Sequence, residues 1–240
     1  LSPAFLGAVS DQAGAAGMTA FGGIITQYED SGTTYRVHTF RGSGKFFVSS
    51  GAADVDWLIV GAGGSGGGNS GGGGGAGEVA TGTGYAVSAG TYTITINAGG
   101  AGVTSSANGN VGGTSVALGT TSAGGGYGGN FETAGGSGAS GGGGGAYRGG
   151  GGAAGSGGSA TGGGSAGGAG GGSGSDYNGG GGGGGGEGGV GAGGSTTTGG
   201  NGGIGVSLPV GGTPGEKSVG NSEDGVETRA AINGINRGVG

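Results

Sequence analysis

Uninterrupted runs of glycine, such as Gly181 to Gly186, constrain the fold of this chain more than any other feature. Glycine makes up 86 of the 240 residues, several times its share in an average protein. Collagen would need glycine at every third position and abundant proline, but the chain has three prolines and no such period. A flexible linker is a poor match as well, because polar and aromatic residues interrupt the runs regularly. The runs therefore need a packed arrangement that glycine alone permits.

The segment DVDWLIVGAGGSGGG, residues 54–68, carries the G-x-G-x-x-G pattern of dinucleotide-binding proteins at Gly61, Gly63 and Gly66. In that motif a helix must follow, present its N-terminus to the pyrophosphate and pack an apolar face on the sheet. Residues 64–77 read GSGGGNSGGGGGAG, and each glycine costs a helix about 1 kcal/mol relative to alanine. The helix cannot form, so we predict no nucleotide site and no cofactor.

Short β-prone runs separated by turn residues begin at Tyr35 and predict a small β-module. They are YRVHTF (35–40), KFFVSS (45–50), VDWLIVG (55–61), EVATG (78–82), YAVSAGTYTITINAG (85–99) and TSVALG (114–119), with a turn expected at GAA (51–53). The residues expected in the core are Phe40, Phe46, Val48, Val55, Trp57, Ile59, Val79, Val87, Ile94 and Ile96.

Within residues 121–206 the glycine runs fall into blocks of similar length, broken by FETA, AYR, SAT, SDYN and STTT. A glycine chain can adopt the polyproline II conformation, whose backbone groups point outward and need partners on neighbouring chains. The expected fold class is therefore mostly β and irregular, with a small β-module fused to a bundle of polyglycine-II helices and almost no α-helix. The expected domains are an arm (1–26), the β-module with a first glycine-rich segment (27–120), the bundle (121–206) and a tail (207–240).

Composition argues against several classes of function. The net charge of −6 and the single Arg148 between residues 61 and 206 do not suit the phosphate backbone of a nucleic acid. No apolar run approaches the roughly 20 residues that span a bilayer.

There is no cysteine, and the one histidine, His38, lies inside a strand-like run. The acid pairs Asp54/Asp56 and Glu223/Asp224 could bind Ca²⁺ or transfer protons, but the first pair more simply solvates a sheet end. We predict no enzyme activity and no metal site.

The stretch HTFRGSGKFFVSSGAADVDWLIVGAGGSGGGNSGGGGGAGEVATG, followed by VSAGTYTITINAGGAG and GGTSVALG, resembles the glycine-rich domain of many bacteriophage tail-fibre and other virion proteins. The resemblance runs from His38 to about Leu118 and fits the glycine-rich remainder to about Val206. The expected architecture is similar to that of the polyglycine-II adhesins at the tips of T-even-like tail fibres. The last 34 residues depart from the family, because they lack the apolar closing strand that many members have.

The resemblance implies a β-module fused to packed polyglycine-II helices and does not by itself imply one function. The leading hypothesis is a non-enzymatic structural and adhesive fibre protein of a virion, which would present rigid turns to a host-cell receptor, either a glycan or an outer-membrane protein. Other virion or fibre subunits are expected partners, and the chain is expected to form a homo-oligomer. The alternative is a self-assembling extracellular fibre subunit, and a third possibility is ice binding, because the same architecture serves several functions.

Two sets of residues are candidates for contacts. Tyr127, Phe131, Tyr147 and Tyr177 are isolated among glycines or lie in expected turns, where aromatic rings often anchor a recognition surface; the alternative is that they cap the glycine array. The arm offers Phe5, Leu6, Val9, Met18 and Phe21, which would dock either on the parent domain or on a neighbouring subunit.

Overall fold

The computed structural model describes residues 17–30, 32–147, 149, 153–172 and 179–206. It also describes the backbone of strand β1 (Ala8–Ser10) and of four short strands near the C-terminus. Those four are β9 (Asn221–Glu223), β10 (Val226–Thr228), β11 (Ala231–Ile232) and β12 (Ile235–Asn236), paired as β9 with β10 and β11 with β12.

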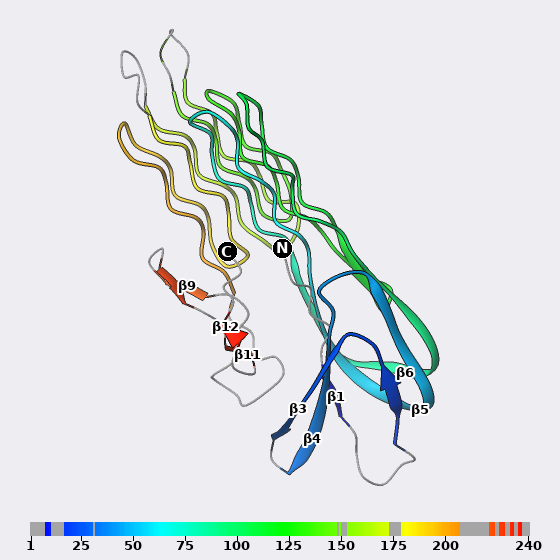
Figure 1. The fold of residues 1–240 in the computed structure, drawn as a ribbon. Helices are drawn as coiled ribbons and strands as arrows, with labels where there is room; N and C mark the ends of the chain where they lie inside the picture. Colours follow the sequence, from blue (N-terminus) through cyan, green and yellow to red (C-terminus); the bar gives the residue numbers. More distant parts are fainter. Residues whose placement is uncertain are drawn as a thin grey trace.

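An eight-stranded antiparallel sheet organises the first half of the chain (Figure 1). Besides β1, its strands are β2 (Thr19–Phe21), β3 (Ile24–Asp30), β4 (Thr33–Thr39), β5 (Gly44–Val60), β6 (Val79–Ile96), β7 (Ser115–Ala117) and β8 (Thr120–Ser122). Their order is β3-β4-β1-β5-β6-β7-β8, and β2 pairs separately with β5. The first residues of the chain thus add β1 and β2 to the same sheet as the predicted β-module.

Strands β5 and β6 are much longer than the runs expected from the sequence. The turn expected at residues 51–53 is instead an irregularity within β5, where the pairing with β6 shifts between Val48 and Ala52. Gly51 lies there at a φ of 77°, in the left-handed region that favours glycine. A bulge of this kind bends a strand without ending it, so β5 continues to Val60.

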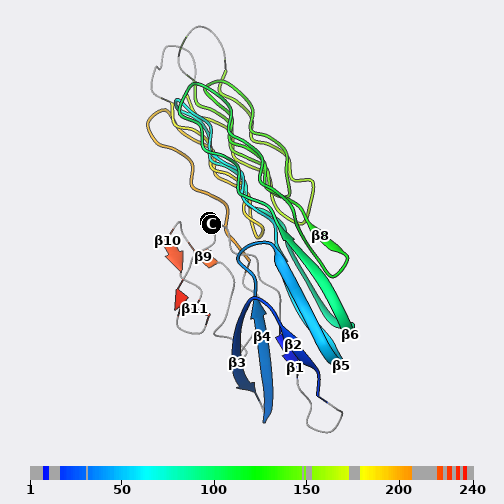
Figure 2. The ribbon, with the colours of Figure 1, turned by 45° about the vertical axis from the view of Figure 1, so that its right-hand side comes forward.

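The described residues within 61–78, 97–114 and 123–206, called here the glycine array, extend from the ends of the sheet strands (Figures 1 and 2). The first hairpin continues the β5–β6 ladder, with bonds at every third residue from Gly61 N to Glu78 O, Gly64 N to Gly75 O and Gly67 N to Gly72 O. Farther along, successive amides of Gly141, Gly142 and Gly143 donate to three different segments, at Ser165, Gly136 and Gly73. The array is therefore held together by backbone hydrogen bonds between segments.

The predicted fold class, with its bundle of polyglycine-II helices, is wrong. The described residues are rich in antiparallel β-sheet and contain no helix, and no bundle of helices is seen. The physical reason lies in the two long strands: the glycine segments leave β5 and β6 as extended continuations of the sheet, already in register with their neighbours. The sequence predicted the bundle for residues 121–206 alone and placed the first glycine-rich segment with the β-module.

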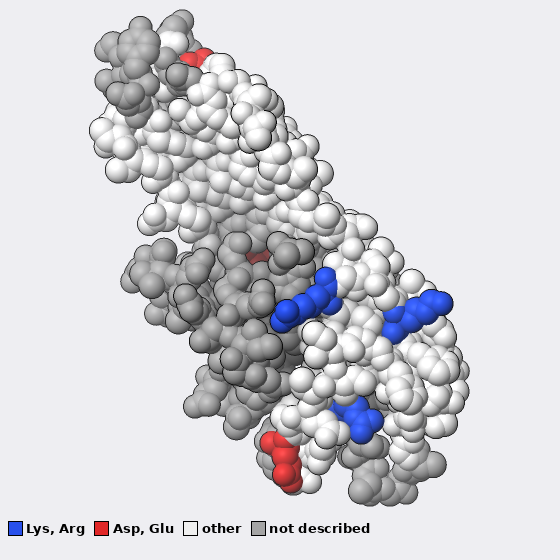
Figure 3. Space-filling model, in the orientation of Figure 1, with Lys and Arg blue, Asp and Glu red and all other residues white. Residues whose placement is uncertain are grey.

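The two halves of the molecule differ in surface charge. On the face in Figure 3, Lys and Arg lie over the sheet, whereas the described part of the glycine array is nearly free of charged side chains. The described surface of the array is consequently made of backbone, small polar side chains and a few exposed apolar residues, Val111, Val190 and Ile204.

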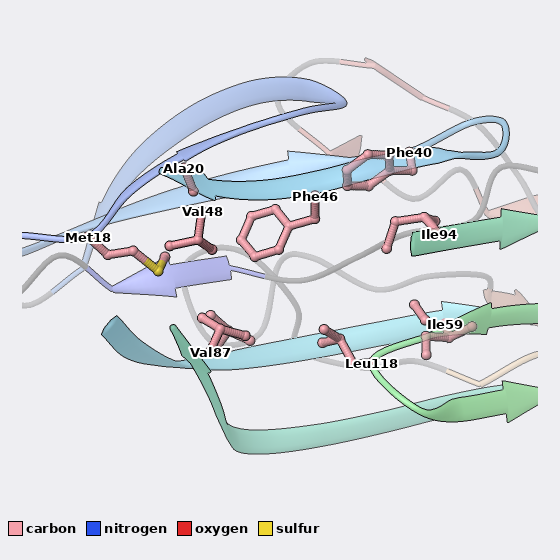
Figure 4. Packing of buried hydrophobic residues seen from close by; sticks show 11 residues of the cluster. Met18, Ala20, Phe40, Phe46, Val48, Ile59, Val87, Ile94 and Leu118 are labelled. Carbon is pink, nitrogen blue, oxygen red and sulfur yellow. The ribbon is translucent and has the colours of Figure 1, made fainter. Parts of the chain in front are cut away.

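The hydrophobic core lies within the sheet (Figure 4). The predicted core residues Phe40, Phe46, Val48, Val55, Ile59, Val87 and Ile94 are all buried in one cluster, with Trp57 and Ile96 packed against it. Met18 and Ala20, from the residues expected to form an arm, belong to the same cluster, as do Ala117 and Leu118. Val79 was also expected in the core but is only half-buried.

A candidate recognition surface at the distal turns

Several chain reversals of the glycine array gather at the end farthest from the sheet (Figure 1). Those that the structure describes lie at residues 68–71, 105–107, 131–132 and 195–198, and we call them the distal turns. They come from parts of the chain more than 120 residues apart in sequence. The array therefore assembles one surface from many separate short segments.

Hydrogen bonds tie the first distal turns to one another. Asn69 Nδ2 donates to Ser106 Oγ at 2.8 Å, and Gly68 N donates to Ala107 O at 2.9 Å. The backbone amide of Asn130, beside the third turn, donates to Asn108 Oδ1 at 2.8 Å. These turns thus form one connected unit.

The backbone network continues to the later segments. Ala146 N donates to Ser70 O and Glu132 N donates to Ala146 O, both at 2.9 Å. In the last turn, Thr198 N donates to Ser195 Oγ at 3.0 Å. Since every turn is fixed at its base by backbone bonds, the positions of the turn side chains are set by the array.

Three non-glycine residues of the distal turns adopt a backbone conformation that glycine would accept more easily. Asn69, Ser70 and Glu132 have φ values of 50°, 59° and 56°, a region that costs other residues about 1–2 kcal/mol. Glycine is abundant in the chain, yet it does not occupy these positions. Strain of this kind is often kept where a side chain is needed, and for Asn69 the bond to Ser106 is one such use.

Polar side chains dominate the described distal turns. Asn69, Ser105 and Ser106 are exposed, and so are all residues from Ser195 to Thr198. Glu132 is the only charged residue within the described turns. Hydroxyl and amide groups can both donate and accept hydrogen bonds, so this surface suits a neutral, polar partner.

The structure separates the four aromatic residues that the sequence singled out. Phe131 lies in a distal turn and is half-buried. Tyr127 is half-buried inside the array, where its ring occupies the space beside Gly136 that a β-carbon would need. Tyr147 is fully buried, so it does not offer its ring at an exposed turn as expected. Tyr177 lies outside the described residues.

The candidate arm residues also lie in different environments. Val9 lies in β1, opposite Arg36 of β4 and Val55 of β5, and Met18 is buried in the core. Phe21, in contrast, is 52% exposed and stacks on Phe47 with ring centroids 6.5 Å apart. Phe5 and Leu6 lie outside the described residues. The parts of the arm that are described therefore pair with the chain's own sheet.

Exposed apolar side chains adjoin Phe21 and form a patch that the sequence did not reveal. It comprises Phe21, Ile25 and Phe47, each more than 40% exposed, and we call it the basal patch. An open groove of about 380 Å³ beside it is lined in part by Phe21, Ile25 and Arg36. This patch lies on the sheet and not on the glycine array.

Groups suited to catalysis are sparse in the described residues. His38 is buried, its Nδ1 donates to Gly22 O at 2.8 Å, and its ring packs edge-on against Phe46. The pKa of His38 is lowered, mainly by burial; the hydrogen bond to Gly22 O opposes this shift, and the charge of Arg36 adds to it.

The acid pairs do not form a described metal site. Asp54 and Asp56 are exposed on one face of β5, and Glu223 and Asp224 have no described side chains. The described part of the chain contains no group of three or more His, Asp or Glu that could hold a metal.

The glycine motif at residues 61–66 has no helix behind it. Residues 64–77 form the extended first hairpin of the array, which confirms that the helix needed by a dinucleotide site does not form. The described residues also include no helix long and apolar enough to cross a membrane.

Taken together, the geometry defines a β-sheet domain with a glycine-rich extension that ends in a polar surface. The family model described as the glycine-rich domain matches residues 38–240, and the chain belongs to this family. Neither a curated protein nor a solved structure matches the chain.

Several residues of the distal turns were missed by sequence reasoning. They are Asn69, Ser70 and Ser106, with Asn108 directly after the second turn; none is aromatic, and aromatic rings were expected to anchor the surface. Their signal was present as the short polar breaks NS and TSSAN within the glycine runs. Breaks in glycine runs thus point to turns more reliably than the presence of a tyrosine does.

Proposed function

We propose that the protein is a non-enzymatic structural and adhesive component of a virion fibre, whose distal turns contact the surface of a host cell. The observation that carries the proposal is the set of distal turns fixed at their bases by the backbone bonds of the glycine array. Membership of the glycine-rich domain family is consistent with this role. The protein would work outside the host cell, together with other fibre subunits.

Fixed turns favour adhesion because a preorganised surface loses little conformational entropy when it binds. The polar exposed residues of the turns match the hydroxyl groups of a glycan through hydrogen bonds. Phe131 adds an apolar ring to the same surface. A host glycan is therefore the receptor that this surface fits best, with an outer-membrane protein as the other class of receptor.

The adhesive role predicts a loss of binding when turn side chains are removed. We expect the combined changes Phe131→Ala, Ser105→Ala and Thr196→Ala to weaken binding to host cells at least tenfold, or about 1.4 kcal/mol. The melting temperature should change little, because the three changes trim side chains and leave the backbone hydrogen bonds of the turns in place. Binding of labelled protein to a panel of Gram-negative cells and to immobilised glycans would measure the effect.

The matched control is Val190→Ala, which trims a side chain that is 68% exposed and lies outside the distal turns. It should bind as the unchanged protein does. Equal binding by the triple variant, or no binding by the unchanged protein to any cell or glycan, would contradict adhesion through these turns.

A second candidate function, self-assembly as a fibre subunit, is favoured by the basal patch. Strand β3 is an edge of the sheet, and edge strands pair readily with another chain. An antiparallel pair of β3 strands centred on Gln27 would place Glu29 of one copy opposite Ile25 of the other. Ile25 lines the groove together with Arg36. The carboxylate of Glu29 in one copy would therefore meet the guanidinium of Arg36 in the other copy.

Self-assembly predicts that the double change Phe21→Ser and Phe47→Ser converts oligomers to monomers. Removing the stacked rings deletes the apolar centre of the patch, which typically contributes most of the binding energy. Sedimentation velocity would measure the oligomeric state, with Val111→Ser as the control because Val111 is 57% exposed outside the patch. If the double variant and the Val111→Ser control have the same oligomeric state, the basal patch is not the contact between copies.

A further inference from the structure

A carboxylate oxygen without a hydrogen-bond partner lies at the opposite end of the glycine array from the distal turns. Glu187 occupies the reversal at residues 187–189, and its Oε2 atom is buried and makes no hydrogen bond. Burying a charged oxygen without a partner is costly. Such a group in a folded protein calls for an explanation, such as an ion or a water molecule.

A second buried oxygen without a partner lies beside it. Ser140 is fully buried, and its Oγ makes no hydrogen bond. A β-carbon built on Gly164 would overlap Ser140 Oγ and would lie 2.9 Å from Ala139 O and 3.0 Å from Glu187 Oε2. A hydroxyl, a carbonyl and a carboxylate oxygen therefore lie close together beside Gly164, where a side chain on residue 164 would displace them.

The local charge is negative. The pKa of Glu187 is raised, mainly by burial; a hydrogen bond from the backbone of Val79 opposes this shift, and the negative charge of Glu78 adds to it. Glu78 is itself held in place, since its Oε2 accepts a hydrogen bond from Ala123 N at 2.8 Å. Two carboxyl groups thus act on the same small region, and a cation placed there would relieve their repulsion.

We propose that Glu187 Oε2, Ser140 Oγ and Ala139 O bind a hard divalent cation, for which Ca²⁺ is the best match. All three donors are oxygen atoms, which Ca²⁺ and Mg²⁺ prefer, whereas zinc and copper favour nitrogen or sulfur. A mixed set of carboxylate, hydroxyl and carbonyl suits the flexible coordination of Ca²⁺ better than the strict octahedron of Mg²⁺. Water molecules would supply the remaining ligands.

The site would join parts of the molecule that are far apart in sequence. Glu187 and Ser140 lie in two reversals of the array, and Glu78 directly precedes β6 of the sheet. Neighbouring backbone bonds, from Gly185 N to Gly141 O and from Ser140 N to Ala76 O, already bring these segments together. A bound cation would therefore stabilise the junction between the sheet and the glycine array.

The test compares thermal unfolding and calorimetric titration of the whole chain with CaCl₂, with MgCl₂ and with EDTA. We expect Ca²⁺ to bind and to raise the melting temperature by about 5 °C at concentrations well above its dissociation constant, with a smaller effect of Mg²⁺. Glu187→Gln should abolish the Ca²⁺ response while folding without the ion, because the amide keeps the shape but not the charge. Ser140→Ala should weaken binding at least several-fold.

The control variant is Glu29→Gln, which removes an exposed carboxylate of β3 on the sheet and should keep the full response. A chain that gives no binding heat and no shift with Ca²⁺ would overturn the proposal. So would an unchanged response in Glu187→Gln or, if that variant does not fold, in Ser140→Ala. Adhesion by the distal turns does not enter this test, so the two proposals stand or fall separately.

Discussion

Replacing Gly143 with alanine should destabilise the protein by roughly 3 kcal/mol or more, at the upper end of the cost of overpacking a protein interior. Gly143 lies in the fully buried run 141–147, and a β-carbon there would overlap the carbonyl oxygen of Gly182. That neighbour is backbone, so no side chain can rotate away to make room. Its carbonyl also accepts a bond from Gly73 N at 2.9 Å, which a shift would break. Chemical denaturation followed by circular dichroism would measure the loss.

The matched control for this change is Gly102→Ala. A β-carbon at Gly102 would meet no atom within 4 Å, and its φ is not in the left-handed region. Because alanine restricts the unfolded chain, this variant should be as stable as the unchanged protein or slightly more so. Equal stability of the Gly143 and Gly102 variants would show that the array is not packed backbone against backbone.

The second large effect is expected for Tyr147→Ala, which should cost about 3–5 kcal/mol, as truncation of other buried aromatic side chains does. Tyr147 is fully buried, its amide donates to Gly171 O at 3.0 Å, and its β-carbon lies close to Gly172. Removing the ring leaves a cavity that the surrounding glycines have no side chains to fill. The change in denaturation midpoint would measure the cost.

Tyr127→Ala provides the comparison, because that ring is only half-buried and its truncation should cost clearly less. If the Tyr147 variant were as stable as the Tyr127 variant, the burial of Tyr147 would not contribute to the fold. A loss of binding without a loss of stability in Tyr147→Ala would restore its expected role in recognition.

The sheet could be predicted from the sequence because its residues carry a periodic signal. Alternation in TYTITIN and the apolar run VDWLIV locate parts of β6 and β5, and most of the expected core is buried. Met18 was predicted to dock on either the parent domain or a neighbouring subunit, and it lies in the chain's own core. Ala20 was missed because it lies among small residues without a clear period. The bend at Gly51 was taken for a turn because a glycine flanked by small residues is typical of both.

The glycine array was harder to predict because glycine carries no side-chain pattern. The sequence located the reversals near residues 131 and 195, but it could not show which segments are neighbours. That is why Tyr147 was expected at an exposed turn although it is buried. The meeting of Glu187 with Ser140, 47 residues earlier in the chain, had no signal in the sequence at all.

The continuation of the β5–β6 ladder into the first array hairpin affects how the molecule bears mechanical load. The bonds from Gly61 to Glu78 and from Gly64 to Gly75 run between antiparallel segments that extend along the length of the molecule. Hydrogen bonds of a ladder lie across the direction of its strands, so a pull between the distal turns and the sheet would load many of them together in shear. If the proposed adhesive function holds, tension between the distal turns and the sheet would thus be carried by the same backbone bonds that hold the described part of the array together.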